Sequence, residues 1–375
     1  MTIYLDHMAS TPLAPEVLAA MLPWMDPAAA GNPHAAHGPG WRAREAVEAA
    51  RAQVAALVGA RPGEVVFTSG ATEANALALL GVEPPGGRAA VPAVDHASVL
   101  SCLPVLAARG VHTELLPVDG AGRVLSGALE EFLAAGPALV SVAAAGGETG
   151  TVQPLGKIGA LCGERGALLH CDAAQALSTR AIDMHGSGIA LLTLSGHKLY
   201  GPMGIGALVV RDGLRVVPPA PGGGQQEGRR PGTLATPLCV GLGEACRLAL
   251  ARREADAGRL LALRERLWAA LSAAVPGIRR NTPPDGLAGC LHVTLPGLDA
   301  ADLLLDLPDL ALATGSACHA GDGRPSPALT AMGMGPGEAH GSLRFGLGRG
   351  TTEAEIDRAA ALLADAVRIR RSGKP

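Results

Sequence analysis

The chain has 375 residues, 48% of them hydrophobic but only 2% aromatic, so we expect about two domains with cores of alanine, leucine and valine. A net charge of −3 provides no basic surface for nucleic acid or anionic membrane, and neither is expected as a partner. The sequence shows no targeting segment and no apolar run of about 18 residues, which predicts a cytoplasmic protein.

Helical and strand-like patterns alternate along the chain up to about residue 235. Residues 41–59 carry apolar side chains at helical spacing, and short apolar runs typical of buried strands follow. The expected strands cover residues 64–68, 89–94, 111–118, 138–144, 167–172, 190–195 and 205–210. Such alternation predicts a mostly parallel sheet with helices on both faces.

The pattern changes near residue 236. A helical stretch rich in leucine and arginine continues to about residue 272, and strand-like segments follow at 290–297 and 342–348. Residues 351–371 predict a helix that begins with a threonine cap and ends with basic side chains. This part of the chain is typical of a second, smaller α+β domain.

The seven cysteines form no CxxC pair and no cluster with histidines at ligand spacing, so we expect neither a disulfide framework nor a metal site. Most of them are expected in the core. Cys318 differs, because its segment ATGSACHAGDGRPSP is small, polar and rich in glycine and proline, as exposed loops are. It is either an ordinary loop cysteine or a reactive thiol.

The segment FTSGATEANALALLG joins an expected strand to an expected helix. Its residues 69–72 place backbone N–H groups and a hydroxyl at the start of the helix, an arrangement that binds anions. An ordinary capped helix after a tight turn would show the same pattern. The GKS or GKT of a P-loop is missing, which disfavours a nucleoside triphosphate.

Asp172 ends the expected strand in HCDAAQAL, and Gln175 follows at the edge of the sheet where α/β proteins bind ligands. Asp172 could cap a helix or keep a ring nitrogen protonated. Lys198, in SGHKLYGPMG, precedes the last of these strands. A phosphate cradle, an acidic partner and a lysine are what pyridoxal phosphate needs, because the lysine forms the Schiff base and the acid keeps the pyridine protonated.

These motifs resemble the NifS/IscS-like cysteine desulfurases of the class V aminotransferase superfamily and the related selenocysteine lyases. The resemblance spans nearly the whole chain, through YLDHMASTPLAPEVLAAM, GNPHAAHGPGWRAREAVEAAR, FTSGATEAN, VDHASVL, ETGTVQPL, HCDAAQAL, SGHKLYGPMGIGAL, GGGQQEGRRPGT, TGSACHAG and SLRFGLGR. It implies the α/β fold type I of pyridoxal-phosphate enzymes. A large cofactor-binding domain would cover 16–240, and 1–15 with 241–375 would form a small domain carrying the catalytic cysteine loop.

The resemblance assigns four residues to the cofactor ring. Lys198 looks like the Schiff-base lysine, and Asp172 like the partner of the pyridine nitrogen. Gln175 resembles the partner of the phenolic oxygen, and His96 resembles the residue that stacks on the ring and carries protons. Lys198 and His96 would therefore be catalytic.

The cofactor's phosphate would be held by two turns of the chain. By the same resemblance, the residues are Ala71 and Thr72 in the first turn and Ser195 and His197 in the second. Thr233, in the RPGT motif, would reach the phosphate from the second subunit. The resemblance therefore also implies a homodimer.

Two residues would act on the substrate, L-cysteine. Arg344 resembles the clamp for its carboxylate, a planar anion that a guanidinium binds through two hydrogen bonds. Cys318 resembles the catalytic cysteine, which takes the sulfur as a persulfide and leaves L-alanine. The long connection between them resembles the subgroup that passes sulfur to an acceptor protein, such as an iron-sulfur cluster scaffold or a tRNA-thiolation enzyme.

The sequence departs from the family pattern at two places. AGGETG places Gly146 and Gly147 where asparagines are usual, and the asparagine aligned with Gly147 normally contacts the cofactor and the substrate carboxylate. Its loss removes roughly 1–3 kcal/mol of hydrogen bonding unless water or another side chain substitutes. The segments RPGT and CHAGDGRPSP lean toward the lyases that act on L-selenocysteine. A non-catalytic sulfur-carrier scaffold is a further alternative.

Overall fold

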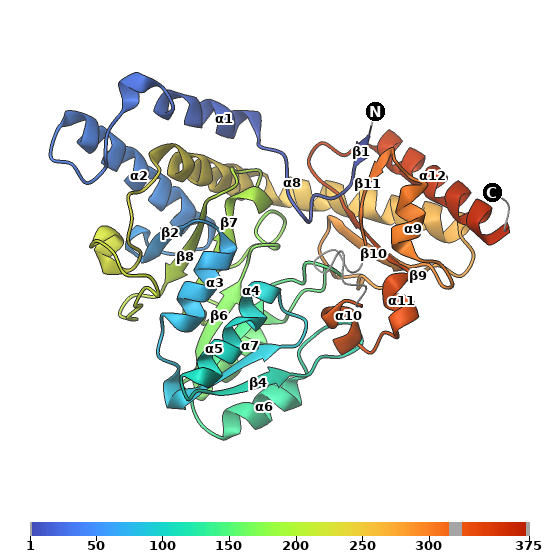
Figure 1. The fold of residues 1–375 in the computed structure, drawn as a ribbon, viewed down its shortest axis with the longest axis horizontal. Helices are drawn as coiled ribbons and strands as arrows, with labels where there is room; N and C mark the ends of the chain where they lie inside the picture. Colours follow the sequence, from blue (N-terminus) through green and yellow to red (C-terminus); the bar gives the residue numbers. More distant parts are fainter. Residues whose placement is uncertain (1, 315–324, 373–375) are drawn as a thin grey trace.

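The computed structural model describes residues 2–314 and 325–372 (Figure 1). Within these residues, seven strands form the largest sheet, in the order β2-β8-β7-β6-β5-β3-β4. Strand β8 is antiparallel to both of its neighbours and the other pairs are parallel, which confirms the predicted mostly parallel sheet. The strands are β2 (Val65–Thr68), β3 (Arg88–Pro92), β4 (His112–Leu116), β5 (Leu139–Ala143), β6 (Leu168–Asp172), β7 (Leu191–Ser195) and β8 (Gly206–Val210).

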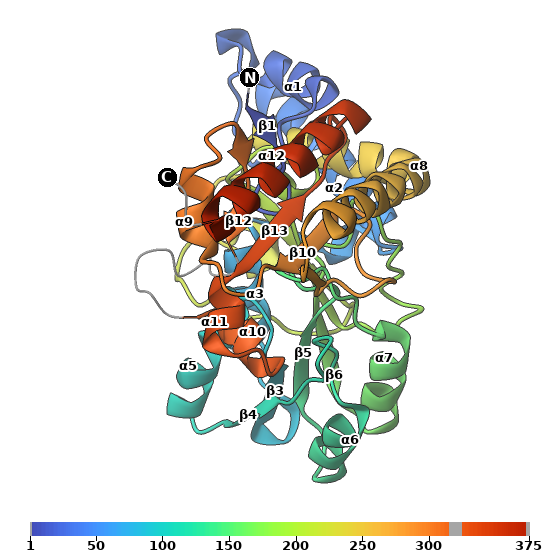
Figure 2. The ribbon, with the colours of Figure 1, turned by 90° about the vertical axis from the view of Figure 1, so that its right-hand side faces the viewer.

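Helices cover both faces of this sheet, because alternate strand residues point to opposite sides and each face needs an apolar cover. On β2, Val65 and Phe67 belong to one core and Val66 to another. Figure 2 shows α5 and α7 on opposite sides of the sheet. The Val66 face packs against α3 (Ala71–Leu80), α4 (Ala97–Leu100) and α5 (Cys102–Ala108). The other face packs against α2 (Gly38–Leu57), α6 (Ser126–Ala134) and α7 (Leu155–Glu164).

A long helix, α8 (Thr236–Ala274), runs through both parts of the molecule (Figure 1) and confirms the predicted helical stretch. Leu242 and Cys246 in its first half belong to the core of the large sheet. Leu263 and Leu267 in its second half belong to a separate core. The predicted division of the chain at 240/241 stays a prediction, since α8 contributes to both cores.

The second core lies in the smaller α+β part. There an antiparallel sheet has the order β12-β13-β10-β9, and β1 pairs in parallel with β11. These strands are β1 (Ile3–Tyr4), β9 (Arg279–Arg280), β10 (Cys290–Thr294), β11 (Leu310–Ala311), β12 (Ala313–Thr314) and β13 (Ser342–Gly346). The remaining α-helices are α1 (Pro15–Met21), α9 (Ala300–Leu305), α10 (Pro327–Ala331), α11 (Pro336–His340) and α12 (Glu353–Ser372). No helix in the described ranges has both the length and the apolar character needed to cross a bilayer.

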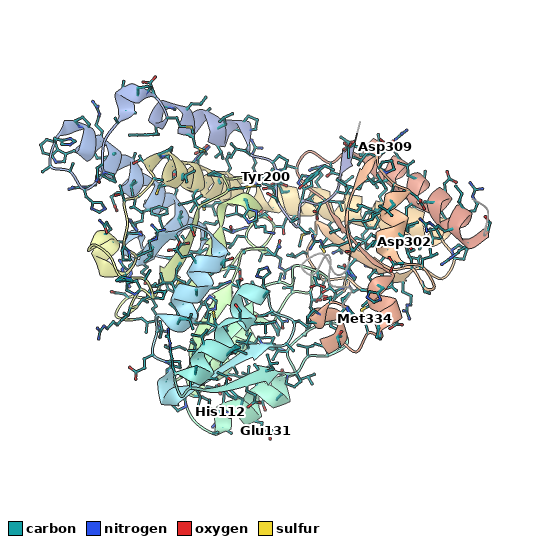
Figure 3. The ribbon with its side chains drawn as sticks, viewed as in Figure 1. His112, Glu131, Tyr200, Asp302, Asp309 and Met334 are labelled. Atoms are coloured by element: carbon teal, nitrogen blue, oxygen red, sulfur yellow. The ribbon has the colours of Figure 1, made fainter. Side chains whose placement is uncertain are left out.

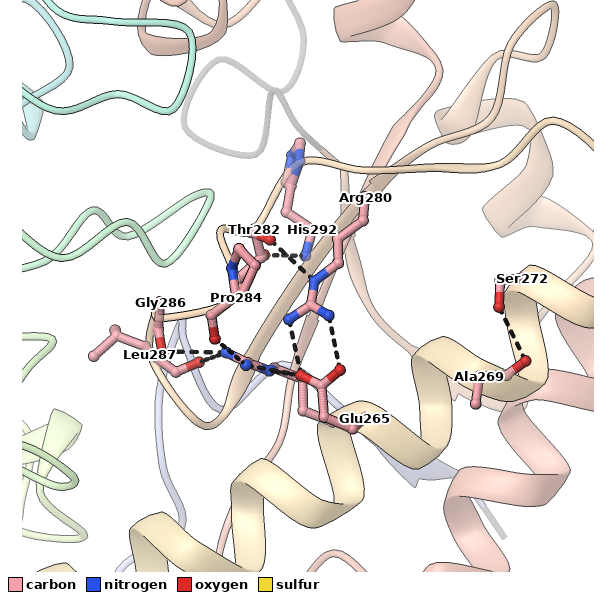
Figure 4. A network of polar contacts seen from close by, with 10 residues as sticks. Glu265, Ala269, Ser272, Arg280, Thr282, Pro284, Gly286, Leu287 and His292 are labelled. Atoms are coloured by element: carbon pink, nitrogen blue, oxygen red, sulfur yellow. Dashed lines mark hydrogen bonds and ion pairs between the residues drawn. The ribbon is translucent and has the colours of Figure 1, made fainter.

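Hydrogen bonds of Arg264 and Arg280 connect α8 to β9 and to the loop that follows it (Figure 4). Arg264 is fully buried and donates three hydrogen bonds to carbonyls of this loop, one of them to Leu287 at 2.9 Å. Its neighbour Glu265 accepts two hydrogen bonds from Arg280, at 2.8 and 2.9 Å. Because the loop backbone is held at several points, Leu287 is fixed in the wall of a hollow that Lys198 and Gln175 also line.

Candidate active site

The carboxyl ends of β6 and β7 bring two predicted site residues to one edge of the large sheet. Asp172 is the last residue of β6, and Lys198 lies in the 3₁₀ turn Gly196–Lys198 that follows β7. The two strands are paired in parallel, so they end at the same edge. This edge is where open α/β sheets bind ligands.

Lys198 and Gln175 converge on one backbone carbonyl. The Lys198 Nζ donates hydrogen bonds to the carbonyls of Met8 and Ala9, the second at 2.9 Å. The Gln175 Nε2 donates to the Met8 carbonyl at 3.0 Å. Both side chains line one hollow, whose wall also includes Leu287. The N-terminal segment therefore contacts two predicted site residues, a role that the resemblance did not assign to it.

Thr11 attaches this N-terminal segment to the turn that carries Lys198. Its N–H and its hydroxyl both donate to the His197 carbonyl at 2.9 Å, and its hydroxyl accepts from the Tyr200 N–H at 2.8 Å. Tyr200 has a left-handed φ of 61°, an uncommon conformation outside glycine that needs such fixed surroundings. Figure 3 shows Tyr200 close to α8, between the two parts of the molecule.

Asp172 is held as a hydrogen-bond acceptor from two sides. Its carboxylate is only 7% exposed and accepts from the Asn75 Nδ2 at 2.8 Å and from the Ala174 N–H at 3.0 Å. Asn75 is fully buried in α3. Asn75 was not among the predicted site residues, although a polar residue inside a largely apolar helical stretch is a signal for it.

His96 lies directly before α4 and its side chain is exposed. Its Nδ1 accepts from the Ser98 N–H at 3.1 Å and lies 2.8 Å from the Ser98 Oγ. The preceding Asp95 is buried and accepts from the Ala143 N–H at 3.1 Å. Burial raises the pKa of the Asp95 carboxyl well above its usual value, and the negative charge of Asp172 adds to this effect.

The predicted phosphate cradle lies at the start of α3. Ala71 and Thr72 are in the first turn of this helix, where backbone N–H groups have no intrahelical carbonyl. Gly206 of β8 packs directly against the turn, because a Cβ at this position would lie 2.8 Å from the Gly70 backbone. Glu73 closes the turn by accepting from the Ser69 N–H at 2.6 Å.

The second predicted half of the cradle follows β7. Ser195 is buried at the end of this strand, and His197 is half-buried one residue before Lys198. Burial and the Lys198 charge lower the pKa of His197 to about 4, so its ring is neutral at pH 7. Thr233 is exposed and lines a surface hollow with Glu73 of α3. Its contact with a second subunit stays a prediction.

Arg344 lies on β13 and is only 7% exposed. Its Nη1 donates to the Gly147 carbonyl and its Nη2 to the Asp6 carboxylate, both at 2.8 Å. Its Nε has no hydrogen-bond partner within the described residues. The guanidinium therefore keeps N–H groups for a further anion, and its contact with Asp6 is one that the resemblance did not assign.

Gly147 lies against Gln175. A Cβ added to Gly147 would be 3.2 Å from the Gln175 Nε2, and the φ of Gly147 lies outside the left-handed region. The backbone at this position is thus open to an L-residue, provided that the end of the Gln175 side chain moves by a few tenths of an ångström. The Gln175 amide occupies space next to the missing asparagine side chain.

Six of the seven cysteines lie in the described part of the chain, and all six are buried, as expected for most of them. Burial raises the pKa of the Cys162 and Cys239 thiols to about 12 and that of Cys290 to about 11. Burial also raises the pKa of the Cys102, Cys171 and Cys246 thiols. Cys318, the predicted catalytic cysteine, lies outside the described residues.

The donor set fits a phosphorylated pyridine aldehyde. The Lys198 amine and the Gln175 amide lie at one hollow, Asp172 offers a carboxylate at the same edge of the sheet, and the start of α3 offers free N–H groups. The Asn75 Oδ1 is a buried polar atom without a partner in the described residues. The chemistry of these residues suits pyridoxal phosphate.

A family model described as aminotransferase class V matches residues 3–359 of this chain. The chain belongs to the class V aminotransferase family. The mitochondrial cysteine desulfurase of Arthroderma benhamiae is 43% identical over 95% of this chain and 72% of its own length. The cysteine desulfurase IscS of Rickettsia akari is 41% identical over 96% of this chain and 90% of its own. Within the family, the chain is therefore a member of the cysteine desulfurases.

Solved structures agree with this assignment. A NifS-like protein from Rickettsia africae superimposes with a TM-score of 0.90 at 28% identity, over 98% of this chain and 100% of its own. The protein SspA in complex with cysteine gives a TM-score of 0.80 at 35% identity, over 92% and 99%. The predicted family and the predicted fold type I are confirmed. The predicted cytoplasmic location stays a prediction, since some relatives are named mitochondrial or mitosomal.

Proposed function

We propose that this cysteine desulfurase uses pyridoxal phosphate to move the sulfur of L-cysteine onto Cys318 and to release L-alanine. The observation that carries the proposal is the convergence of Lys198 and Gln175 on the Met8 carbonyl. These two side chains line one hollow, and Asp172 ends β6 at the same edge of the sheet. An amine, an amide and a carboxylate are what this cofactor's aldehyde, phenolic oxygen and ring nitrogen require.

The cofactor would be held by residues at the ends of β2, β6 and β7. The first turn of α3 would bind the phosphate, with Ser195 and His197 of the neighbouring turn. The Asp172 carboxylate would accept a hydrogen bond from the protonated ring nitrogen and so keep it protonated. Bound pyridoxal phosphate supplies a ring that accepts electrons from the substrate's Cα.

Three residues would then act on the substrate. Arg344 binds the carboxylate with the N–H groups that Asp6 and Gly147 leave open. The Lys198 Nζ takes the proton from Cα, and the exposed His96 ring carries a proton near the cofactor. Each of these groups makes a hydrogen bond within the described residues: Lys198 to the Ala9 carbonyl, His96 with Ser98, and Arg344 to Asp6.

The family resemblance assigns Cys318 as the thiol that accepts the sulfur. The six described cysteines support this choice, because they are buried and burial raises the pKa of each thiol. The Cys318 thiolate forms a bond to the substrate sulfur while the bond from that sulfur to Cβ breaks. The protein thiol becomes a persulfide, and the substrate carbon skeleton gains the hydrogen that makes it L-alanine. One L-cysteine and one thiol thus give one L-alanine and one persulfide, with no other oxidant or reductant.

L-Selenocysteine is a second candidate substrate, favoured by the RPGT and CHAGDGRPSP segments. The proposal also includes a homodimer in which Thr233 completes the partner's site, and an acceptor protein for the persulfide sulfur.

The deciding experiment is a titration of the purified protein with L-cysteine. The visible spectrum, L-alanine and persulfide are followed together, and the persulfide is located by mass spectrometry. We expect equal amounts of L-alanine and Cys318 persulfide before an acceptor is added. A yellow protein that releases no L-alanine would instead be a sulfur-carrier scaffold. Competition between L-cysteine and L-selenocysteine then identifies the preferred substrate.

A further inference from the structure

A chain of three hydrogen-bonded contacts links Asp172 to His96. The Asn75 Nδ2 donates to Asp172 Oδ2 at 2.8 Å and to the Ser98 Oγ at 2.9 Å. The Ser98 Oγ in turn lies 2.8 Å from the His96 Nδ1. The four side chains come from three elements. Asp172 ends β6, Asn75 is on the buried side of α3, and His96 and Ser98 lie at the start of α4.

The direction of donation in this series of hydrogen bonds follows from its two end groups, Asp172 and His96. An ionised carboxylate can only accept, so the Asn75 amide must present its Nδ2 to Asp172. The opposite orientation would place the Asn75 Oδ1 against the carboxylate, two acceptors facing each other. The observed orientation leaves the Asn75 Oδ1 without a partner in the described residues, while the Nδ2 donates to two acceptors.

The Asn75 Nδ2 also determines the direction in which the Ser98 hydroxyl donates. Because the Asn75 Nδ2 donates to the Ser98 Oγ, this oxygen accepts and its own hydrogen is free to point at the His96 Nδ1. The Ser98 backbone N–H also points at Nδ1, at 3.1 Å, and a backbone N–H can only donate. Two donors facing one ring nitrogen leave no room for a proton on it, so Nδ1 is the acceptor.

We propose that Ser98 and Asn75 are positioning residues that hold His96 as the Nε2–H tautomer, and that the charge of Asp172 sets the direction of donation in this series of hydrogen bonds. The proton of the neutral ring is then on Nε2, the nitrogen left free on the exposed side chain. The use of this proton in desulfuration rests on the proposed function. The tautomer itself does not, because it follows from contacts present without substrate.

The alternative is an ordinary helix cap. His96 caps α4 through the Ser98 N–H, and this contact by itself makes Nδ1 an acceptor. The cap uses only the Ser98 N–H. It involves neither the Ser98 hydroxyl nor the contacts that connect this hydroxyl through Asn75 to Asp172. Ser98→Ala keeps the cap and removes the link, so this variant separates the two explanations.

The test is NMR on the full-length protein labelled with ¹⁵N-histidine, before and after loading with pyridoxal phosphate. Long-range ¹H–¹⁵N correlations distinguish protonated from bare ring nitrogens, and the His96 signals are assigned by their loss in His96→Gln. We expect a bare Nδ1 and a protonated Nε2 in both samples. A proton on Nδ1, or a fast average of the two tautomers, would overturn the proposal whether or not the protein releases L-alanine.

The variants then test the hydroxyl. Ser98→Ala should show a detectable Nδ1-protonated population and a several-fold lower kcat for L-alanine release, with KM within about twofold. Ser98→Thr keeps a hydroxyl and should restore both the single tautomer and kcat. Ser101→Ala, an exposed serine at the end of α4 without a side-chain cap, is the matched control and should change neither. A single tautomer with unchanged kcat in Ser98→Ala would leave only the helix cap and refute the link to Asp172.

Discussion

The Arg344 guanidinium donates to the Asp6 carboxylate at 2.8 Å, although 338 residues separate the two along the chain. Arg344 lies on an inner strand of the small sheet, and Asp6 belongs to the N-terminal segment that contacts Lys198 through Met8. A guanidinium stays charged when it is buried, so Asp6 compensates a charge that would otherwise lie unpaired beside the site. This ion pair joins the predicted carboxylate clamp to the segment that contacts the predicted Schiff-base lysine.

Asp6→Asn should lower the free energy of unfolding by about 1–3 kcal/mol, because it leaves the buried Arg344 charge without its carboxylate. Chemical denaturation at neutral pH measures this loss. The control is Asp365→Asn, which breaks the exposed ion pair with Arg368 and should cost no more than about 0.5 kcal/mol. Equal losses in the two variants would show that Asp6 contributes no more than an ordinary surface charge.

Lys198→Ala should abolish L-alanine release and the covalent link to the cofactor while the fold is retained, since Lys198 is half-buried and does not belong to an apolar core. Borohydride reduction followed by mass spectrometry detects the cofactor on the wild-type lysine. Lys157→Ala, at an exposed position on α7, is the matched control and should behave as wild type. Normal turnover by Lys198→Ala would disprove the assignment.

Cys318→Ala should still bind L-cysteine but form no persulfide, because binding uses Arg344 and Lys198, whereas sulfur capture needs the thiol. Mass spectrometry of the protein after exposure to L-cysteine checks this. Cys162→Ala removes a buried thiol whose pKa burial raises to about 12, and it should keep persulfide formation. Persulfide on another cysteine of the Cys318→Ala protein, together with normal L-alanine release, would remove Cys318 from the mechanism.

Gly147→Asn should lower KM for L-cysteine by about tenfold, if the new amide donates one charge-assisted hydrogen bond to the substrate carboxylate. The structure adds a steric cost, because the new Cβ would lie 3.2 Å from the Gln175 Nε2. Gly147→Ala has the same Cβ without the amide and measures that cost alone. Steady-state kinetics of both variants should show a lower KM for asparagine than for alanine. Identical KM values with intact cofactor loading would mean that another group already replaces the family asparagine.

Acid should destabilise the protein through His170, which is fully buried between the Ser141 and Thr193 hydroxyls. Burial lowers the pKa of His170 to about 4, against about 6.5 in the unfolded chain. Between these values the unfolded chain binds the extra proton, so stability is complete above about pH 6.5 and falls as pH decreases toward 4. The loss amounts to about 3 kcal/mol.

Denaturation curves at several pH values test this through a pair of variants. His170→Gln does not titrate and should show a shallower decline in unfolding free energy between about pH 6.5 and 4. His112→Gln, at an exposed position on β4, should keep the wild-type slope. A His170→Gln slope equal to that of wild type would mean that His170 is not the group that protonates on unfolding.

The large sheet and the ends of its strands were predictable from sequence because the signals are local. Most of the seven strands are short apolar runs next to a turn, so Asp172 and Lys198 could be placed at strand ends from their neighbours alone. The long helix α8 is likewise a continuous pattern along one segment. Six buried cysteines could be separated from Cys318 by the apolar character of their surroundings.

Tertiary structure alone decided which distant groups meet. Asp6 meets Arg344, Met8 meets Lys198 across 190 residues, and Asn75 meets Asp172 across 97. None of these pairs has a local pattern, because a hydrogen bond depends on where whole strands and helices pack rather than on the residues beside it. The sequence by itself determined which side chains reach the carboxyl edge of the sheet. The packing of the N-terminal segment and of α3 against that edge determined what those side chains contact, since only in the folded chain do their donors and acceptors come within 3 Å or so of each other.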